Sequence, residues 1–353
     1  MVTRRSRLTG PAGATTLQDV AVEAGVSLAT ASRALHGGTR VVTAELRERV
    51  EKAARALGYT SNGPAQALAR ATTPVIGLIV HDITDPYFSA MAIGAMRVAH
   101  EAGLLVLVCN TFRDPRLELD YVARLKAQRA RGVLLFGSGF TDRGYQEALR
   151  RELDSVTALG GRVACISPHG FETDAVLPDH RGGGRLAAGH LAQDLGHRRI
   201  GVVSGPANLL VNQERLRGFR ERLRALGVPA PPGQLVKSDF TREGGRAATV
   251  ELMRRAPDLT AIFVLNDVMA LGVLAALREE LTLSVPDEVS VVGFDDIGVT
   301  MDVQPPLSTV HLPLEEIGEQ GMRLLLDGRP TAPRTVRVPA RLVHRASSAR
   351  PRA

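Results

Sequence analysis

The sequence predicts a small N-terminal all-α unit of helix-turn-helix type, followed by an α/β core of two Rossmann-like lobes. Two observations support this fold class. Helix-start and helix-stop signals recur between residues 16 and 58, and short apolar runs alternate with amphipathic stretches from Val75 onward. With 353 residues, the chain is too long for one ordinary domain and long enough to bury a substantial core.

Composition and charge narrow the possible classes of protein. The chain is 44% hydrophobic and 23% charged, which is typical of soluble globular proteins. No apolar run approaches the roughly 18 residues that a membrane helix needs. Residues 1–14 carry three arginines but no apolar stretch of the kind found in signal peptides. We therefore expect a cytoplasmic protein with no membrane partner and with a disordered basic tail over residues 1–15.

The positive charge is concentrated at the N-terminus. The net charge is +7, and the first seventy residues contain ten Lys/Arg against five Asp/Glu. Such an asymmetry indicates a polyanion as partner, although a solvated basic tail explains the charge equally well. The sequence pattern has to decide between the two.

Three helices are predicted between residues 16 and 58. Thr16 provides a capping hydroxyl before an apolar periodicity, which marks a helix start, and Gly25 ends that helix. Ser27 and Thr43 cap the next two helices in the same way. Short helices around an alanine-rich core are typical of a compact DNA-reading unit. The second and third helices are expected over residues 28–35 and 44–57.

Four segments of this region occur in a specific order, namely Thr16-Leu17-Gln18-Asp19-Val20-Ala21, Ala24-Gly25-Val26-Ser27, Thr30-Ala31-Ser32-Arg33 and Gly58-Tyr59. Together they resemble the headpiece of the lactose-repressor and galactose-repressor family. A bare helix-turn-helix pattern has many false positives, but ordered matches followed by the right kind of core are specific. The resemblance implies a DNA-binding transcriptional regulator, with repression as the expected direction, and a periplasmic-binding-protein-like core.

The resemblance places three residues of the second helix against base edges in the major groove. Arg33 would bind a guanine through two hydrogen bonds, whereas Leu28 and Ala29 offer apolar contact, for example to a thymine methyl group. This pair is more similar to the galactose-repressor branch. The serine and threonine hydroxyl groups of this unit are explained either as helix caps or as phosphate contacts, and a residue that caps a helix can do both. The implied phosphate contacts are Thr16, Ser27, Thr30, Ser32, Thr43 and Tyr59.

A short linker, residues 62–72, joins the DNA-binding unit, residues 16–61, to the core. In the family this segment forms a hinge helix only on DNA, where a leucine wedges open a base step in the minor groove; Leu68 matches that leucine. The chain departs from the family at Ser61, where proline is usual, and at Gly63-Pro64. Because glycine lowers helix stability, hinge ordering is expected to depend more heavily on DNA. A linker without function is the alternative.

The core is predicted to contain parallel sheets flanked by helices, because apolar runs alternate with amphipathic stretches. The resemblance implies chain crossovers near residues 179, 306 and 331. They divide the core, residues 73–345, into a first lobe (73–179 and 307–331) and a second lobe (180–306 and 332–345), followed by a tail over residues 346–353. The expected strands are Val75–Val80, Leu104–Cys109, Val133–Phe136, Val163–Ile166, Ile200–Val203, Ala261–Leu265 and Val289–Val292.

Ligands in such sheets bind beyond the carboxyl ends of the strands, so the polar and aromatic residues that follow each run are the candidates. Family pockets have an arginine and an aspartate at the positions of Arg215 and Asp295, and two further candidates, Asn266 and Phe240, also match ligand-facing positions. Carboxylates, bidentate donors and an aromatic platform suit a sugar or a purine-like ring. The predicted effector contacts are Asp82, Tyr87, Phe88, Asn110, Ser138, Arg215, Phe240, Asn266 and Asp295.

Each of these residues also has a structural explanation. Asp295 can serve as a helix cap, and Tyr87-Phe88 can belong to the core. The chain also departs from typical sugar sites: Leu209 and Val211 stand where some relatives have polar groups, and Ser167-Pro168 occupies a strand end that often carries an aspartate. The pocket is therefore expected to be less polar than a typical sugar site.

The predicted function is that of a regulator that binds a palindromic operator as a homodimer and is controlled by a sugar-like or nucleoside-like effector. Two copies are expected because one headpiece buries too little surface for tight specific binding. An exported solute-binding protein with the same core is the first alternative. The absence of a signal-peptide pattern and the ordered segments from Thr16 to Tyr59 argue against it.

An enzyme is the second alternative class, and no catalytic residue, metal ion or cofactor is predicted. Adjacent residues such as Asp295 and Asp296 normally point in different directions at a strand end. The run Gly182-Gly183-Gly184 lacks the Lys-Ser/Thr of a phosphate-binding loop, and the histidines lack the spacing of a zinc site.

Overall fold

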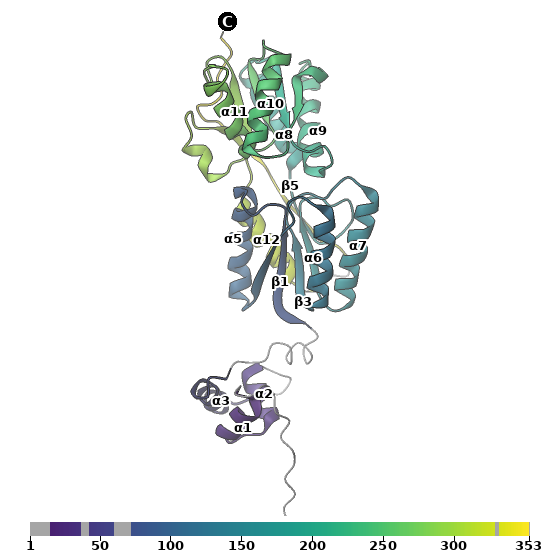
Figure 1. Ribbon diagram of the computed structural model, residues 1–353, viewed down its shortest axis with the longest axis vertical. Helices are drawn as coiled ribbons and strands as arrows, with labels where there is room; N and C mark the ends of the chain where they lie inside the picture. The colour runs from purple at the N-terminus through teal and green to yellow at the C-terminus, as the bar shows by residue number, and fades with distance from the viewer. Residues whose placement is uncertain (1–14, 37–41, 60–71, 329–331, 353) are drawn as a thin grey trace, which may run out of the picture. The chain divides into compact units, whose positions relative to one another are not determined.

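The computed structural model describes residues 15–36, 42–59, 72–328 and 332–352. The chain forms two compact units, residues 1–70 and residues 71–353, whose internal arrangement is drawn in Figure 1. All but the last residue of the predicted tail, residues 1–15, and all but the last residue of the predicted hinge, residues 62–72, lie outside the described residues, and Leu68 is among them.

The first unit contains the three predicted helices, α1 (Leu17–Glu23), α2 (Leu28–His36) and α3 (Ala44–Ala56). They pack around a small core in which alanine predominates, so the helices approach closely. The sequence prediction of a three-helix unit is confirmed. Its buried residues are Val20, Ala21, Ala24, Ala31, Ala34, Val50, Ala53 and Ala54.

The helix starts of this unit follow from local hydrogen bonds. Thr16 and Asp19 form a capping box, in which the Thr16 hydroxyl accepts from the Asp19 amide while the Asp19 carboxylate accepts from the Thr16 amide. Ser27 accepts from the Thr30 amide at 3.1 Å. Gly25 has a φ of +62°, a left-handed conformation that suits glycine in the tight turn between two helices. The chain therefore reverses direction within a few residues.

The first lobe of the second unit is a six-stranded parallel sheet with the order β11-β5-β4-β3-β1-β2. Helices α5 (Pro86–Glu101) and α12 (Leu314–Leu326) pack together on one side, and α6 (Pro115–Ala127) packs with α7 (Arg143–Ala158) on the other (Figure 1). The strands are β1 (Thr73–Val80), β2 (Leu105–Asn110), β3 (Ala130–Leu135), β4 (Arg162–Ile166), β5 (Ala175–Pro178) and β11 (Thr335–Val338).

The second lobe repeats this architecture with the strand order β12-β10-β9-β8-β6-β7, in which only the β10–β12 pair is antiparallel. Its strands are β6 (Ile200–Ser204), β7 (Leu235–Lys237), β8 (Ala261–Val264), β9 (Ser290–Asp295), β10 (Ser308–His311) and β12 (Arg341–Val343). Its helical segments are α8 (His180–Gly189), η1 (His190–Asp194), α9 (Leu210–Ala225), η2 (Pro232–Gln234), α10 (Arg242–Arg255), α11 (Asp267–Glu279) and η3 (Gly298–Met301).

The second and third crossovers between the lobes differ from the prediction. The chain leaves the first lobe after β5, as expected near residue 179, but β10 still pairs with β9, so the return follows residue 311 rather than 306. Likewise β11 pairs with β5, and the last crossover falls between residues 338 and 341 rather than near 331. Both strands have four residues and a polar composition, so they do not form the apolar runs on which the prediction depended.

The predicted C-terminal tail, residues 346–353, is wrong at Ser347, Ser348 and Ala349, which belong to the second lobe. Ser347 is fully buried between two strands of the second lobe: the Val291 amide donates to its carbonyl at 2.8 Å, and the Ser308 amide donates to its hydroxyl at 2.8 Å. Ser348 is also buried. Because serine and alanine carry no hydrophobic signal, this integration into the core was not visible in the sequence.

Three helix pairs cross at glycines that have no room for a side chain. In the α5–α12 pair, a Cβ on Gly94 would overlap the carbonyl of Glu315, and a Cβ on Gly318 would overlap the carbonyl of Met91. The α8–α9 pair crosses in the same way at Gly184 and Gly218, and the α10–α11 pair crosses at Gly245 and Gly272.

Among the described residues, no helix is both long and apolar enough to cross a bilayer.

We expect Gly318→Ala to lower the free energy of unfolding of the core by about 1–3 kcal/mol, because the added methyl group overlaps backbone that cannot move cheaply. Chemical denaturation followed by circular dichroism measures this change. The control is Gly233→Ala in η2, where no atom lies within 4 Å of the added Cβ. Equal stability of the two variants would contradict the close crossing.

Candidate functional site

A cavity lies between the two lobes of the core at the carboxyl ends of their strands, where a parallel sheet usually binds its ligand. Its volume is about 40 Å³, much smaller than the several hundred Å³ typical of small-molecule sites. Residues from both lobes line it: His81, Asp85, Tyr87, Phe88, Arg113, Gly137 and Ser138 from the first, and Leu209, Val211, Arg215, Phe240, Asn266 and Asp295 from the second.

The small volume has a structural cause in direct contacts between the lobes. The Thr141 amide donates to the Asn208 carbonyl at 2.8 Å, and the Leu210 amide donates to the Gly139 carbonyl at 3.0 Å. The Ser138 hydroxyl accepts from the Val211 amide at 2.8 Å. A ligand the size of a sugar therefore requires the lobes to move apart at these loops.

The centre of the site is an ion pair between Arg215 and Asp295, both 3% exposed. The guanidinium donates to a carboxylate oxygen of Asp295 at 2.6 Å and to the Leu265 carbonyl at 2.5 Å. It also lies 3.8 Å from the ring centroid of Phe294, close enough for a cation–π contact. These contacts fix the guanidinium from several directions at once.

His180 completes the shell around Arg215. Its Nδ1 accepts a hydrogen bond from the Arg215 Nε at 3.3 Å, so its Nε2 carries the proton and donates to the Ser167 hydroxyl at 3.2 Å. Burial lowers the pKa of His180 well below its usual value, and the Arg215 charge lowers it further. The imidazole is therefore neutral and adds no positive charge to the site.

Asp295 occupies an unusual backbone conformation at the end of β9. Its φ is +113°, and Asp296 follows with +60°. The carboxylate of Asp267 holds this turn, because it accepts from the Ile297 amide at 3.1 Å and from the Thr309 hydroxyl at 2.7 Å. Burial raises the pKa of Asp295 to about 7, while Arg215 opposes the shift. Backbone strain is thus stored where the carboxylate enters the cavity.

Three helices begin at the cavity, and each has a first-turn amide bonded to a protein side chain. At α5, Asp85 accepts from the Tyr87 amide at 3.0 Å. At α11, the Asn266 Oδ1 accepts from the Met269 amide at 2.9 Å. At α9, Val211 donates to Ser138 as described above. These caps occupy donors that would otherwise face a ligand.

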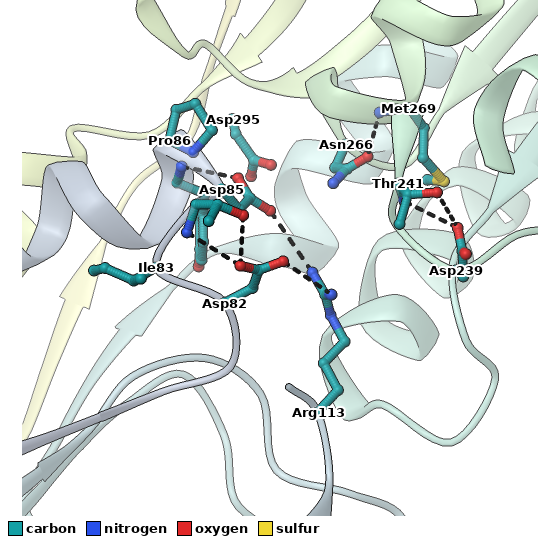
Figure 2. A network of polar contacts seen from close by, with 12 residues as sticks. Asp82, Ile83, Asp85, Pro86, Arg113, Asp239, Thr241, Asn266, Met269 and Asp295 are labelled. Carbon is teal, nitrogen blue, oxygen red and sulfur yellow. Dashed lines mark hydrogen bonds and ion pairs between the residues drawn. The ribbon is translucent and has the colours of Figure 1, made fainter. Parts of the chain in front are cut away.

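Arg113 lines the cavity, and its guanidinium points toward Asp82 and Asp85 (Figure 2). Its guanidinium is 3.7 Å from the Asp82 carboxylate and 3.8 Å from that of Asp85, both in the first lobe. From the second lobe the Phe240 ring approaches it, with the centroid at 5.9 Å. Arg113 has a φ of +61°, and Phe112 before it has +53°. The loop between β2 and α6 thus turns sharply to direct the guanidinium toward the cavity.

Seven of the nine predicted effector contacts line this cavity: Tyr87, Phe88, Ser138, Arg215, Phe240, Asn266 and Asp295. The other two do not. Asn110 accepts from the Ile83 amide at 2.7 Å, and Asp82 accepts from the Thr84 amide at 3.1 Å while facing Arg113. Both shape the loop after β1.

Sequence reasoning missed four lining residues, namely His81, Asp85, Arg113 and Gly137. For Asp85 a signal existed, since an aspartate before Pro86 is a typical helix start. His81 is fully buried against the rings of Phe88 and Phe140, and burial lowers its pKa to about 3.

Within the described ranges, no three His, Cys, Asp or Glu residues are grouped so that they could hold a metal ion.

The candidate DNA-contacting residues lie on the surface of the first unit. Leu28 is 47% exposed, and Ala29 beside it is also exposed. Arg33 is half-buried, and its Nε donates to the Ala29 carbonyl at 2.9 Å. Its side chain must therefore give up this hydrogen bond and turn away from the helix surface to reach a base. Among the phosphate candidates, Thr16, Ser27 and Thr43 are exposed, whereas Thr30, Ser32 and Tyr59 are half-buried.

Both units of the chain match known protein families. Residues 16–62 match the family described as bacterial regulatory proteins, lacI family. Residues 188–348 match a periplasmic binding protein-like domain. The predicted fold class, a helix-turn-helix headpiece with a two-lobed periplasmic-binding-protein-like core, is confirmed.

Relatives cover nearly the whole chain. The transcriptional repressor CytR of Escherichia coli K12 is 35% identical over 89% of this chain and 89% of its own length. The regulator GalR of the same organism is 32% identical over 89% and 90%. Among solved structures, a lac repressor dimer bound to operator and the anti-inducer ONPF has a TM-score of 0.80 at 27% identity, covering 95% of this chain and 99% of that one.

A complex of the transcriptional regulator CelR with cellobiose has a TM-score of 0.70 at 32% identity and covers 94% of this chain and 99% of the other. The match of the headpiece, the match of the core and the relatives of this identity and coverage all indicate the same family. The chain belongs to the lacI family of bacterial regulatory proteins.

Proposed function

We propose that this protein is a transcriptional repressor that binds a palindromic operator as a homodimer and is controlled by a small sugar-like or nucleoside-like effector. The observation that carries the proposal is one chain that joins a helix-turn-helix unit to a core with a cavity between its lobes, lined by aromatic and polar side chains. Since DNA is its partner, we place its action in the cytoplasm.

The DNA-reading role rests on helix α2. Leu28 and Ala29 expose small apolar groups at its N-terminal end, and Arg33 lies one turn further along the same helix. A helix of this kind enters the major groove with its N-terminal residues against the bases. Hydroxyl groups at the helix starts, as in Ser27 and Thr43, are suited to phosphate contact together with the amides that they cap.

The effector role rests on the free polar atoms of the cavity. The Asp295 carboxylate uses one oxygen for Arg215, and its Oδ2 has no partner among the described residues. The Asn266 side chain uses only its oxygen to cap α11, so its amide hydrogens are available within the described structure. An acceptor and a donor beside the Phe240 ring suit a ring-shaped ligand with hydroxyl groups. Bound cellobiose and ribose in two family structures support this chemistry.

The homodimer is supported by an apolar surface on the first lobe. Strand β2 is an edge strand, yet its side chains Leu105, Leu107 and Val108 are exposed. Phe112 after the strand is 74% exposed. Exposed apolar edge strands are aggregation hazards unless another chain covers them. A second copy covering this surface would bring two headpieces to one operator, and a palindrome provides two matching half-sites.

Replacing Arg33 by alanine is expected to weaken operator binding by about 1–3 kcal/mol and to relax specificity at one base of each half-site, because the bidentate guanine contact is lost. The measurement begins with selection of bound sequences from a random duplex pool by the full chain at two salt concentrations. Recovery of no palindrome would contradict the operator proposal.

The second step compares affinities of wild type and Arg33→Ala for the selected duplex and its single-base variants. Arg255→Ala in α10, which removes an exposed arginine from the core, is the matched control. An unchanged affinity and base preference in Arg33→Ala would remove Arg33 from base recognition.

Asp295→Asn is expected to lower the affinity for the effector by about 10–100-fold while operator binding is retained, since a hydrogen bond to a charged acceptor contributes about 1.5–3 kcal/mol. The asparagine keeps an oxygen for Arg215 and thus limits the damage to the fold. Isothermal titration with ribose, cellobiose and ribonucleosides measures the effect, and Asp142→Asn at the start of α7 is the control. A normal effector response in Asp295→Asn would mean that the ligand binds elsewhere.

Leu107→Glu is expected to convert the dimer to monomer at micromolar concentration, because it buries a charge in the proposed interface. Sedimentation velocity measures the assembly, and operator titration should show a parallel loss of affinity. The control is Leu159→Glu at the end of α7, a leucine of similar exposure (44% against 50%) outside the proposed interface. A dimer that persists in Leu107→Glu would place the interface on another surface.

A further inference from the structure

We propose that the cavity selects an uncharged, hydroxyl-bearing ligand and rejects phosphorylated or otherwise anionic analogues. This inference rests on the proposed effector function of the cavity and narrows its ligand class. Four features of the cavity support it: the balance of charge, the state of its cations, the state of its helix N-termini, and the character of its free polar atoms.

The charge balance around the cavity is unfavourable to an anion. Asp85 and Asp295 line it and Asp82 lies at its rim, against two guanidinium groups, those of Arg113 and Arg215. The neighbouring histidines do not add charge. Burial lowers the pKa of His81 to about 3 and that of His169 to about 4, and it also lowers the pKa of His180 well below its usual value. Three carboxyl groups thus face the two guanidinium groups. Burial raises the pKa of Asp85, and it raises that of Asp295 to about 7, but the carboxylates still leave no excess of positive charge for an anion.

Both guanidinium groups already face carboxylates. Arg215 already binds Asp295, the Leu265 carbonyl and His180, and its plane is covered by the Phe294 ring. The Arg113 guanidinium lies 3.7 Å from the Asp82 carboxylate and 3.8 Å from that of Asp85 (Figure 2), too far for a hydrogen bond but close enough for both negative charges to offset its own. A phosphate at this guanidinium would also lie close to both carboxylates and would be repelled by them.

Two of the helix N-termini that meet at the cavity, those of α5 and α11, are occupied as well. A free N-terminus is a ready anion site, because its first amides have no partner within the helix. At α5 and α11 the amides of Tyr87 and Met269 are bonded to the side chains of Asp85 and Asn266, within the same lobe in each case. The cap at α5 is itself a carboxylate, which repels an incoming anion.

The free polar atoms favour neutral hydroxyl groups. The Asp295 Oδ2 is an acceptor, and Asp85 has one oxygen for the Tyr87 amide while the other lies 3.8 Å from Arg113. Carboxylates accept hydrogen bonds from hydroxyl groups, and the Asn266 amide can donate to a ring or hydroxyl oxygen. Phe88 and Phe240 provide apolar walls for the face of a sugar ring or a base.

Matched pairs of ligands test the proposal. The panel contains ribose and ribose 5-phosphate, glucose and glucose 6-phosphate, and cytidine and adenosine with their 5′-monophosphates. Binding to the full chain is measured by isothermal titration and by thermal melting. We expect at least one uncharged member to bind and its phosphorylated partner to bind at least about 100-fold more weakly, as several kcal/mol of like-charge repulsion implies.

A phosphorylated member that binds as tightly as its uncharged partner, or more tightly, would overturn the proposal. So would a panel in which no member binds, since the ligand would then not be of this class. That failure remains distinguishable from failure of the proposed function, because operator selection reports DNA reading without any effector.

Variant Asp85→Asn separates charge from shape. Asparagine is as good a helix cap as aspartate, so the start of α5 is preserved while one negative charge is lost. We expect the ratio of affinities between uncharged and phosphorylated partners to fall at least about 10-fold. Asp142→Asn makes the same change at the start of α7, outside the cavity, and should leave the ratio unchanged. An unchanged ratio in Asp85→Asn would overturn the role of charge.

Discussion

The buried ion pair between Arg215 and Asp295 is the constraint on which the core depends. Two charges this far from water are stable only when hydrogen bonds and neighbouring dipoles replace the lost hydration. The Leu265 carbonyl and the Phe294 ring provide part of this environment, and His180 provides the rest as a neutral acceptor. Because these groups come from α8, α9 and the ends of β8 and β9, a single pair fixes the geometry of one wall of the cavity.

The cavity and the edge of the first lobe are joined by one short segment. Arg113 faces the cavity rim, while the residue before it, Phe112, is exposed beside strand β2. Both have left-handed backbone conformations, which non-glycine residues adopt at a cost and mainly where the surroundings enforce it. One strained turn therefore carries both Arg113, which lines the cavity, and Phe112, which belongs to the surface proposed for a second copy. A change in the backbone of this turn would affect the cavity and that surface together.

The sequence predicted the elements with strong local signals and failed where the signal was tertiary. Capping residues such as Thr16 and the long apolar runs marked helices and central strands well, because these patterns follow directly from backbone hydrogen bonding and burial. Strands β10 and β11 were not predicted, and the crossovers beside them were misplaced, because four-residue strands of mixed polarity have no such pattern. Residues at strand ends could be located but not oriented: Asn110 holds a loop, whereas Arg113, which was not considered, faces the cavity.

The interleaving of the two lobes also orders events during synthesis of the chain. The first lobe is complete only after β11 has been made, and the second lobe only after Ser347 is in place between β9 and β10. The core of the three-helix unit, by contrast, contains no described residue beyond Tyr59. Since proteins fold domain by domain from the N-terminus as they leave the ribosome, a nascent chain can present its DNA-reading helices before either sheet of the core has closed.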